Sequence, residues 1–408
     1  MVHVYVVGVG MTAFRKHSDK SVKDLTKMAL DAVQSDAGAA IPFDVAFFAN
    51  TAQGHLEGQS MISGQIALQS AGLEGIPVIN VENACASGAT AFHQALTYLK
   101  SGSGRIALAI SAEKLFHPDK SKSFSLFDGA WDVHEARRNL RDVLELGKSV
   151  VPAGSPESKN RSIFMDIYAA WARYHMERFG TTQRQIAMVS AKNHWHSTMN
   201  PLAQFRNDMT VEEILAARAI CWPLTLPMCA PISDGAAASI LCTEDALSLF
   251  PDVVPVRVLS SALVTGVKRE VEELNRHISR RAAQRAYELA GVDPKDISVA
   301  EVHDATAFAE IQQYENLGFC ETGAGGSLVE SGTTKLGGKL PVNTSGGLES
   351  KGHPIGATGL GQIHELVLQL RGQAGARQVP GAKLAVAENG GGYYAGEEAV
   401  ACVTILGR

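Results

Sequence analysis

Cys85 is the residue of this chain whose surroundings most favour nucleophilic chemistry. It stands in Val81-Glu-Asn-Ala-Cys-Ala-Ser-Gly88, directly before a run with helical periodicity at residues 87–99. The first N–H groups and the positive dipole end of a helix favour an anion, so this position is expected to lower the pKa of the thiol. Small neighbours on both sides leave room for a carbonyl carbon. A lone cysteine is more often a packing residue, but this context predicts a nucleophile.

His353 is the expected base for this nucleophile. Cys85-Ala-Ser-Gly-Ala-Thr90 aligns without a gap with His353-Pro-Ile-Gly-Ala-Thr358, and a helical run follows each. Two further pairs match in the same order: residues 45–50 with 299–304, and residues 105–110 with 383–388. Three collinear matches predict a duplicated α/β half, with Cys85 and His353 in equivalent strand-to-helix turns. We therefore expect His353 to take the thiol proton or to hydrogen-bond an acyl oxygen.

Polar residues at two other expected strand ends complete the candidate site. His303-Asp304 follows a strand-like run at 299–302, and Asn389-Gly-Gly-Gly392 follows one at 384–387. Consecutive glycines let backbone N–H groups point at one oxygen atom, which is how an oxyanion is stabilised during acyl transfer.

The pattern of the whole chain is that of an α/β protein. Strands are expected at residues 4–9, 45–49, 106–111, 253–259, 299–302 and 384–387, and helices at 23–35, 87–99, 276–290 and 360–371. Between them the chain is richer in charged and aromatic residues and holds an amphipathic run at 164–179. The sequence thus predicts a first half in two pieces, 1–113 and 223–250, a loop or lid domain at 114–222, and a second half at 251–408.

Composition argues against several other classes of function. The 408 residues carry a net charge of −5, so no basic excess attracts nucleic acid or an anionic membrane. The six cysteines show no zinc-finger spacing, and neither a metal site nor a disulfide scaffold is expected. No apolar stretch suits a membrane span, and the first residues look like a strand rather than a signal peptide. The expectation is a cytoplasmic protein.

Five segments, in order and over essentially the whole chain, resemble the thiolase superfamily. They are Val81 to Gly88, Asp-Gly-Ala-Ala-Ala at 234–238, His303-Asp304, Asn343 to Gly359 and the glycines at 390–392. The block Gly-His-Pro-x-Gly-Ala-Thr-Gly is highly specific, and the branch that it most resembles is the thiolases linked to sterol carrier protein. The resemblance implies a five-layered αβαβα fold from two duplicated halves plus an inserted loop domain. It also implies a homodimer or tetramer that acts on coenzyme A thioesters without a bound cofactor.

The resemblance assigns a role to each matching residue. Cys85 would take the acyl group, His353 would activate it, and His303 would help to hold a thioester oxygen. The N–H groups of Cys85 and Gly390 would form a second oxyanion hole. Thiolases also use a second cysteine as acid and base, and the corresponding positions here carry Glu388 and Ala305.

Glu388 is a substitute base only if burial raises its pKa strongly, because an ordinary glutamate has a pKa of about 4.3 against about 8.5 for cysteine. If Glu388 points away, Asn389 lines the site instead. Asp304, His55 and Tyr393 are weaker candidates for lining the substrate pocket.

The sequence therefore predicts an acyltransferase that cleaves a 3-oxoacyl-CoA with CoA, or runs the reverse Claisen condensation, through an acyl-Cys85 intermediate. A bulky or aromatic acyl group, such as benzoylsuccinyl-CoA, is compatible with this class. The missing second cysteine leaves two alternatives: a retro-aldolase acting on a β-hydroxyacyl-CoA, or a CoA-ester-binding subunit of a complex. Relatives in this branch pair with a small OB-fold, zinc-ribbon protein, and such a partner is a further expectation.

Overall fold

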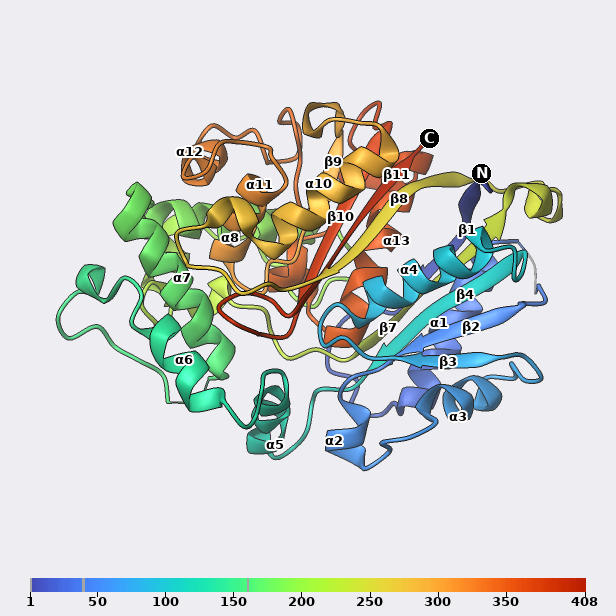
Figure 1. Cartoon of the computed structure of the whole chain (residues 1–408), viewed down its shortest axis with the longest axis horizontal. Coiled ribbons are helices and arrows are strands. Elements are labelled where there is room, and N and C mark those ends of the chain that lie inside the picture. Colours follow the sequence, from blue (N-terminus) through green and yellow to red (C-terminus); the bar gives the residue numbers. More distant parts are fainter. Residues whose placement is uncertain (1, 39–40, 160) are drawn as a thin grey trace.

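The computed structural model describes residues 2–38, 41–159 and 161–408; for residues 136–139 it describes the backbone alone. Within these ranges nine strands form one mixed sheet in the order β3-β2-β4-β7-β1-β8-β11-β10-β9 (Figure 1). The strands are β1 (Val4–Met11), β2 (Val45–Ala49), β3 (Val78–Val81), β4 (Ile106–Glu113), β7 (Gly235–Thr243), β8 (Val256–Thr265), β9 (Val299–Glu301), β10 (Leu384–Gly391) and β11 (Val400–Gly407). A separate short hairpin joins β5 (Ala219–Cys221) and β6 (Leu224–Thr225).

The sheet contains the same arrangement of strands twice. β1, β7, β4 and β2 are neighbours in that order, and β8, β11, β10 and β9 repeat it on the other side of the short β1–β8 pairing. The register repeats as well: Val45 of β2 lies beside Ala107 of β4, and Val299 of β9 lies beside Ala385 of β10. These are the residue pairs that the sequence alignment of the two halves predicts.

Helices cover both outer faces of the sheet halves and fill the space between them (Figure 1). The central pair is α4 (Ser87–Lys100) and α13 (Thr358–Arg371), which share a core with inward residues of both halves. On the outside, α1 (Val22–Asp36) and α3 (Ser63–Ser70) pack on the first half, and α10 (Ile278–Ala290) and α11 (Ala307–Asn316) pack on the second. The structure thus has the layered α/β arrangement of two related halves that was expected.

Glycine allows the two central helices to approach closely at their first turns. A Cβ added to Gly88 would lie 2.6 Å from the carbonyl oxygen of Gly356, its counterpart in the other half. A Cβ added to Gly359 would lie 2.5 Å from the backbone nitrogen of Ala89. This contact brings the turns that carry Cys85 and His353 together at the centre of the molecule.

The described residues between the two pieces of the first half add no strand to the nine-stranded sheet and contain five α-helices. These are α5 (Lys120–Ser125), α6 (Ala136–Leu144), α7 (Ile163–Phe179), α8 (Gln183–Thr198) and α9 (Val211–Ala216). In Figure 1, α6 and α7 lie at the edge of the molecule away from the first sheet half. The remaining helices are α2 (Gln53–Glu57) and α12 (Gly325–Glu330).

The strand whose limits differ most from the expected ones is β8. The run at residues 253–259 predicts a strand there, but β8 begins at Val256 and continues to Thr265. Pro255 precedes it and has no N–H to give to a sheet, so the residues before it form a turn. Beyond residue 259 the strand continues beside β11, up to the pair of Thr265 and Val400.

Candidate active site

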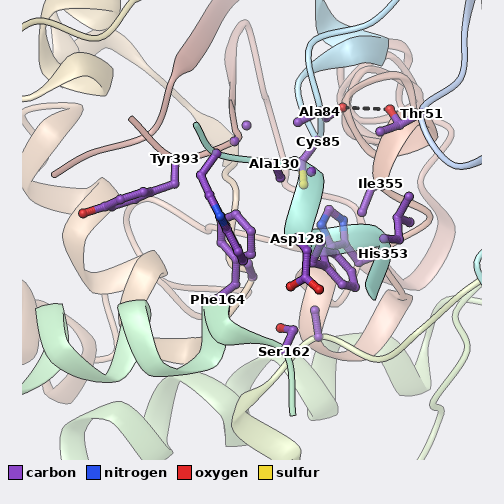
Figure 2. Close-up of a pocket in the computed structure, with 18 of the residues that line it drawn as sticks. Thr51, Ala84, Cys85, Asp128, Ala130, Ser162, Phe164, His353, Ile355 and Tyr393 are labelled. Atoms are coloured by element: carbon purple, nitrogen blue, oxygen red, sulfur yellow. Dashed lines mark hydrogen bonds between the residues drawn. The ribbon is translucent and has the colours of Figure 1, made fainter. Parts of the chain in front are cut away.

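A cavity of about 1120 Å³ opens where both halves and the inserted segment meet. Cys85, His303 and His353 line it, together with the glycines at the end of β10. Phe164, on α7, closes the opposite side (Figure 2). The wall is mainly apolar and aromatic, with a few polar groups near the sulfur, as in many small-molecule sites.

Cys85 sits in a tight turn between β3 and α4. The preceding residue, Ala84, has a φ of +48°, a conformation that costs a non-glycine residue about 1–2 kcal/mol. The Ala84 carbonyl holds the turn because it accepts hydrogen bonds from Thr51 Oγ1 (3.3 Å, Figure 2) and Ser87 Oγ (2.6 Å). Such strain is characteristic of functional turns, and here it fixes the sulfur at the floor of the cavity.

The Cys85 sulfur and one nitrogen from each of His303 and His353 lie within 4.8 Å of one another. The two imidazole rings are perpendicular, with centroids 5.2 Å apart. Figure 2 shows the Cys85 sulfur facing the His353 ring. The sequence predicts each of these residues separately, and the structure brings all three together.

Hydrogen bonds set the tautomer of His353. Its Nδ1 lies 2.7 Å from Thr358 Oγ1, whose own hydrogen goes to the Pro354 carbonyl at 3.2 Å. Thr358 therefore accepts from Nδ1–H, and Nε2 keeps a free lone pair. Burial holds the pKa of His353 well below its usual value, with further lowering by His303 and Lys351. The ring is neutral near pH 7 and can accept a proton at Nε2.

His303 is held in the opposite tautomer. Asn389 Nδ2 donates to its Nδ1 at 2.9 Å, so the ring proton lies on Nε2. Burial lowers the pKa of His303 to about 4. A neutral imidazole with N–H at Nε2 is a hydrogen-bond donor for a carbonyl or thioester oxygen. Asn389 is thus a positioning residue behind His303, and it does not line the cavity.

The expected low pKa of Cys85 is contradicted. Burial raises the pKa of this thiol to about 12, and the nearby carboxylates Glu113 and Glu82 add to the rise. The N–H groups of Cys85 itself and Gly392 act in the opposite direction, but more weakly. The expected helix terminus is present, but the loss of water around the thiol raises its pKa more than the helix dipole lowers it. The free protein therefore holds a neutral thiol beside a neutral imidazole.

We expect alkylation of Cys85 by iodoacetamide in a His353→Gln protein, which lacks the base, to accelerate about tenfold per pH unit between pH 7 and 10, because only the thiolate then reacts and its fraction rises tenfold per unit below the pKa. Peptide mass spectrometry would follow the labelling at Cys85. A plateau reached below pH 8 would show a stabilised thiolate and would contradict the neutral-thiol state.

The glycines nearest to Cys85 are Gly391 and Gly392 rather than Gly390. Both line the cavity, and a Cβ added to Gly391 would lie 3.0 Å from the Cys85 nitrogen. Gly390 pairs with Ala401 in the sheet, and an added Cβ there would face the Glu398 side chain. The family pattern placed the second oxyanion donor at Gly390, whereas the geometry favours the next two residues of the run.

Glu388 does not reach the cavity wall. It lies one residue before Asn389 in β10, so its side chain projects from the other face of the strand. Its oxygens accept from Ser279 Oγ and from the backbone N–H of His303, both at 3.0 Å. Burial raises the pKa of Glu388 to about 8. The pKa of Glu388 is thus raised as a catalytic base would require, but its carboxyl supports the His303 backbone instead of facing substrate.

The weaker candidates divide into two groups. His55 and Tyr393 line the cavity, and His55 Nε2 lies 3.0 Å from Ser125 Oγ. Asp304 does not line it. This fully buried carboxylate accepts from the backbone N–H of Leu348 at 2.7 Å and so holds the loop before His353.

Cys229 and Glu398 are among the polar residues of the cavity wall that sequence reasoning missed. Cys229 reaches it, but its thiol donates to the Thr225 carbonyl (3.5 Å) within the core beneath the inserted segment. Glu398 also lines it and is only 2% exposed. No motif marks Glu398, because the turn between β10 and β11 that carries it follows the glycine run without a regular pattern.

In the part of the chain that the structure describes, two clusters have the spacing of metal ligands. The sulfur and nitrogens of Cys85, His303 and His353 are ligand types that suit Zn²⁺, but a metal would first have to displace the thiol proton. The second cluster is Asp304, Glu310 and Glu349. There the Lys192 ammonium lies 2.7 Å from Glu310 and supplies positive charge itself.

Family models match both halves of the chain. Residues 4–215 match the thiolase N-terminal domain, and residues 265–408 match the thiolase C-terminal domain-like family. The chain belongs to the thiolase family. Thiolases are acyltransferases that act on CoA substrates, and the resemblance seen in the sequence motifs is confirmed.

Curated thiolase relatives extend over almost the whole chain. Rabbit sterol carrier protein 2 (Oryctolagus cuniculus) is 38% identical over 95% of this chain and 69% of its own length. An acetyl-CoA acetyltransferase of Methanothermobacter thermautotrophicus is 37% identical, covering 96% of this chain and 97% of its own. The benzoylsuccinyl-CoA thiolase subunit BbsB of Thauera aromatica is 32% identical, covering 92% and 91%.

Solved structures show the same thiolase fold. The Ltp2-ChsH2(DUF35) aldolase aligns with a TM-score of 0.77 at 22% identity, over 99% of this chain and 97% of that chain. Human mitochondrial 3-ketoacyl-CoA thiolase in complex with CoA aligns with a TM-score of 0.70 at 16% identity, over 100% and 98%. Among the described residues, no helix of this thiolase is long and apolar enough to cross a membrane.

Proposed function

We propose that this thiolase cleaves a 3-oxoacyl-CoA with CoA, or catalyses the reverse Claisen condensation, through an acyl group on Cys85. The observation that carries the proposal is the convergence of the Cys85 sulfur with His303 and His353 within 4.8 Å on the floor of one cavity. A nucleophile, a neutral base and a neutral hydrogen-bond donor are together what acyl transfer requires.

Each group has a separate task in this mechanism. His353 Nε2 removes the Cys85 proton as the sulfur attacks the 3-oxo carbon. The N–H groups of the Cys85 turn and of the Gly391–Gly392 pair stabilise the oxyanion that forms there. The Nε2–H of His303 holds the thioester oxygen of the leaving CoA ester as its enolate forms. CoA then takes the acyl group from Cys85.

The cavity favours a bulky, ring-containing acyl group. Its wall includes seven aromatic side chains: Phe124, Phe127, Trp131, Phe164, Tyr168, Tyr393 and Tyr394. Most of them belong to the stretch at 114–222, which we propose acts as a lid domain inserted into the first half. An aromatic acyl group such as that of benzoylsuccinyl-CoA fits this wall, and the relative from Thauera aromatica carries that name.

Product analysis tests the proposed reaction. Purified protein mixed with a panel of aliphatic and aryl 3-oxoacyl-CoA esters should form two CoA thioesters only when CoA is added. Liquid chromatography with mass spectrometry would detect both products. If the panel includes an accepted acyl group and no CoA-dependent cleavage occurs, the proposed reaction is wrong.

A retro-aldolase is the second candidate. The likeness to the Ltp2-ChsH2(DUF35) aldolase and the carboxylate and alanine at the two expected cysteine positions, Glu388 and Ala305, favour it. Cys85 with its base argues against it, because retro-aldol cleavage needs no acyl-enzyme. Release of a free aldehyde or ketone from a β-hydroxyacyl-CoA without added CoA would decide for this reaction.

We also propose that the chain works in an assembly, either as a homodimer or tetramer or as the CoA-ester-binding subunit of a larger complex. β3 is the edge strand of the sheet and exposes Ile79, which suits pairing with a second copy. A small OB-fold, zinc-ribbon subunit is the proposed further partner. Co-expression followed by size-exclusion chromatography and zinc analysis tests it.

All six cysteines are free, which fits the reducing cytoplasm as the proposed location.

A further inference from the structure

Two neighbouring glutamates between β10 and β11 have opposite surroundings. Glu397 is fully satisfied: it accepts from Arg269 Nε at 2.6 Å and from the backbone N–H groups of Val267 (3.1 Å) and Ile278 (3.0 Å). Among the described residues, neither oxygen of Glu398 has a hydrogen-bond partner. Glu397 is a structural carboxylate. Burial of the Glu398 carboxyl costs folding free energy that no hydrogen bond to its oxygens offsets.

His277 lies close to Glu398 but carries no positive charge that would offset the charge of its carboxyl. His277 Nδ1 accepts from Asn316 Nδ2 (3.1 Å) and from the backbone N–H of Ser279 (3.3 Å), so the ring proton is on Nε2. That Nε2 lies 3.4 Å from Glu398 Oε2. Burial holds the pKa of His277 well below its usual value, so the ring stays neutral. Arg269, the cation that lowers the pKa of Glu398, is already paired with Glu397.

Glu398 is in the same cavity wall as the nucleophile. Its Cγ would lie 3.0 Å from a Cβ added at Gly390, beside the glycines that approach Cys85. Tyr168 lines the same wall, and burial raises the pKa of its hydroxyl well above the usual value, with a further rise from Glu398. Burial raises the pKa of Glu398 to about 7, and Glu397 adds to the rise while Arg269 opposes it.

We propose that Glu398 is the acid/base catalyst that transfers the carbon-bound proton, the role that other thiolases give to a second cysteine. The inference rests on the proposed acyl-Cys85 reaction. Three observations support it: Glu398 is in the cavity wall, neither of its oxygens has a hydrogen-bond partner among the described residues, and the neutral His277 ring lies 3.4 Å from one of them. A carboxyl that is half protonated near neutral pH can both donate and accept a proton.

The atoms and protons balance in both half-reactions. In the first, the Cys85 proton moves to His353 as the sulfur bonds to the 3-oxo carbon. The carbon–carbon bond then breaks, the enolate carbon takes the proton of Glu398, and His353 returns its proton to Glu398 through water in the cavity. In the second, the CoA thiol gives its proton to His353, its sulfur displaces Cys85, and His353 reprotonates the Cys85 sulfur.

This division of labour is testable because only the first half-reaction touches a carbon-bound proton. Acetyl-CoA in D₂O reports Glu398 through deuterium entering the methyl group, measured by mass spectrometry. Exchange of isotope-labelled CoA into acetyl-CoA reports Cys85 and His353 alone. In Glu398→Gln we expect deuterium incorporation to fall about 10²–10⁴-fold, with CoA exchange within about threefold of wild type. Glu398→Asp should recover part of the deuterium incorporation.

The possible outcomes separate the two proposals. Normal deuterium incorporation in Glu398→Gln, with normal CoA exchange, would overturn the role of Glu398 and leave the acyl-enzyme intact. An equal loss of both exchanges in a folded Glu398→Gln protein would also overturn it, because it would show a structural role. Wild-type protein that exchanges no CoA would contradict the acyl-enzyme itself. Circular dichroism and thermal unfolding check that the variants fold.

Discussion

Replacing His353 by glutamine is expected to slow acylation of Cys85 by about 10²–10⁴-fold, the usual contribution of a positioned general base. The raised pKa of Cys85, about 12, leaves almost no thiolate near pH 7. A neutral His353 with a free Nε2 is the group that removes the proton as the sulfur attacks. Glutamine keeps a polar side chain of similar length but cannot accept this proton.

The pH dependence separates this role from a structural one. Without His353, acylation depends on the free thiolate, so its rate should rise about tenfold per pH unit up to about pH 10. The wild-type rate should change much less over the same range. His3→Gln, a histidine outside the cavity wall, is the matched control and should behave like wild type. A His353→Gln protein with wild-type acylation at pH 7 would refute the base assignment.

Gly391→Ala is expected to reduce kcat by about 10²–10³-fold, the effect of losing one oxyanion donor. The new Cβ would lie 2.6 Å from the Ala86 nitrogen and from the Asn83 carbonyl oxygen, and 3.0 Å from the Cys85 nitrogen. All three contacts are backbone atoms of the turn that holds the nucleophile. Because this turn cannot bend away locally, it must shift, and its N–H groups lose their alignment with the reacting oxygen.

Gly407→Ala is the matched control for this overpacking. Its Cβ would also be crowded, at 2.9 Å, but by the flexible end of the Leu259 side chain and far from the cavity wall. Both variants should lose about 1–3 kcal/mol of unfolding free energy, measured by urea denaturation, whereas only Gly391→Ala should lose turnover. Normal kcat in a folded Gly391→Ala protein would show that the turn does not form an oxyanion hole.

The sequence predicts the duplicated halves from three collinear matches, and the strand pairs Val45–Ala107 and Val299–Ala385 of the structure are equivalent in that alignment. The facing turns of Cys85 and His353 follow directly from that symmetry. The side of a strand on which a residue points is harder to predict. Glu388 and Asn389 are neighbours in β10, and a shift of one residue exchanges their faces. Neither side chain lines the cavity, so the position that the family pattern suggested places no acid or base in its wall.

Two properties of the site depend on the folded surroundings alone. The pKa of Cys85 depends on how much water the surrounding residues exclude, which a local helix signal does not contain. Glu398 differs from Glu397 only in its partners. Arg269 and two backbone N–H groups donate hydrogen bonds to Glu397, whereas neither oxygen of Glu398 has a hydrogen-bond partner among the described residues. In the sequence the two are adjacent identical residues.

Intact-protein mass spectrometry after mixing with acyl-CoA esters tests the central claim most directly. The wild-type protein should gain the mass of one acyl group, peptide mapping should place it on Cys85, and added CoA should remove it. Cys85→Ala should gain no mass, while Glu398→Gln should still be acylated. The absence of any adduct across aliphatic and aryl esters, or an adduct that persists in Cys85→Ala, would contradict the acyl-Cys85 mechanism.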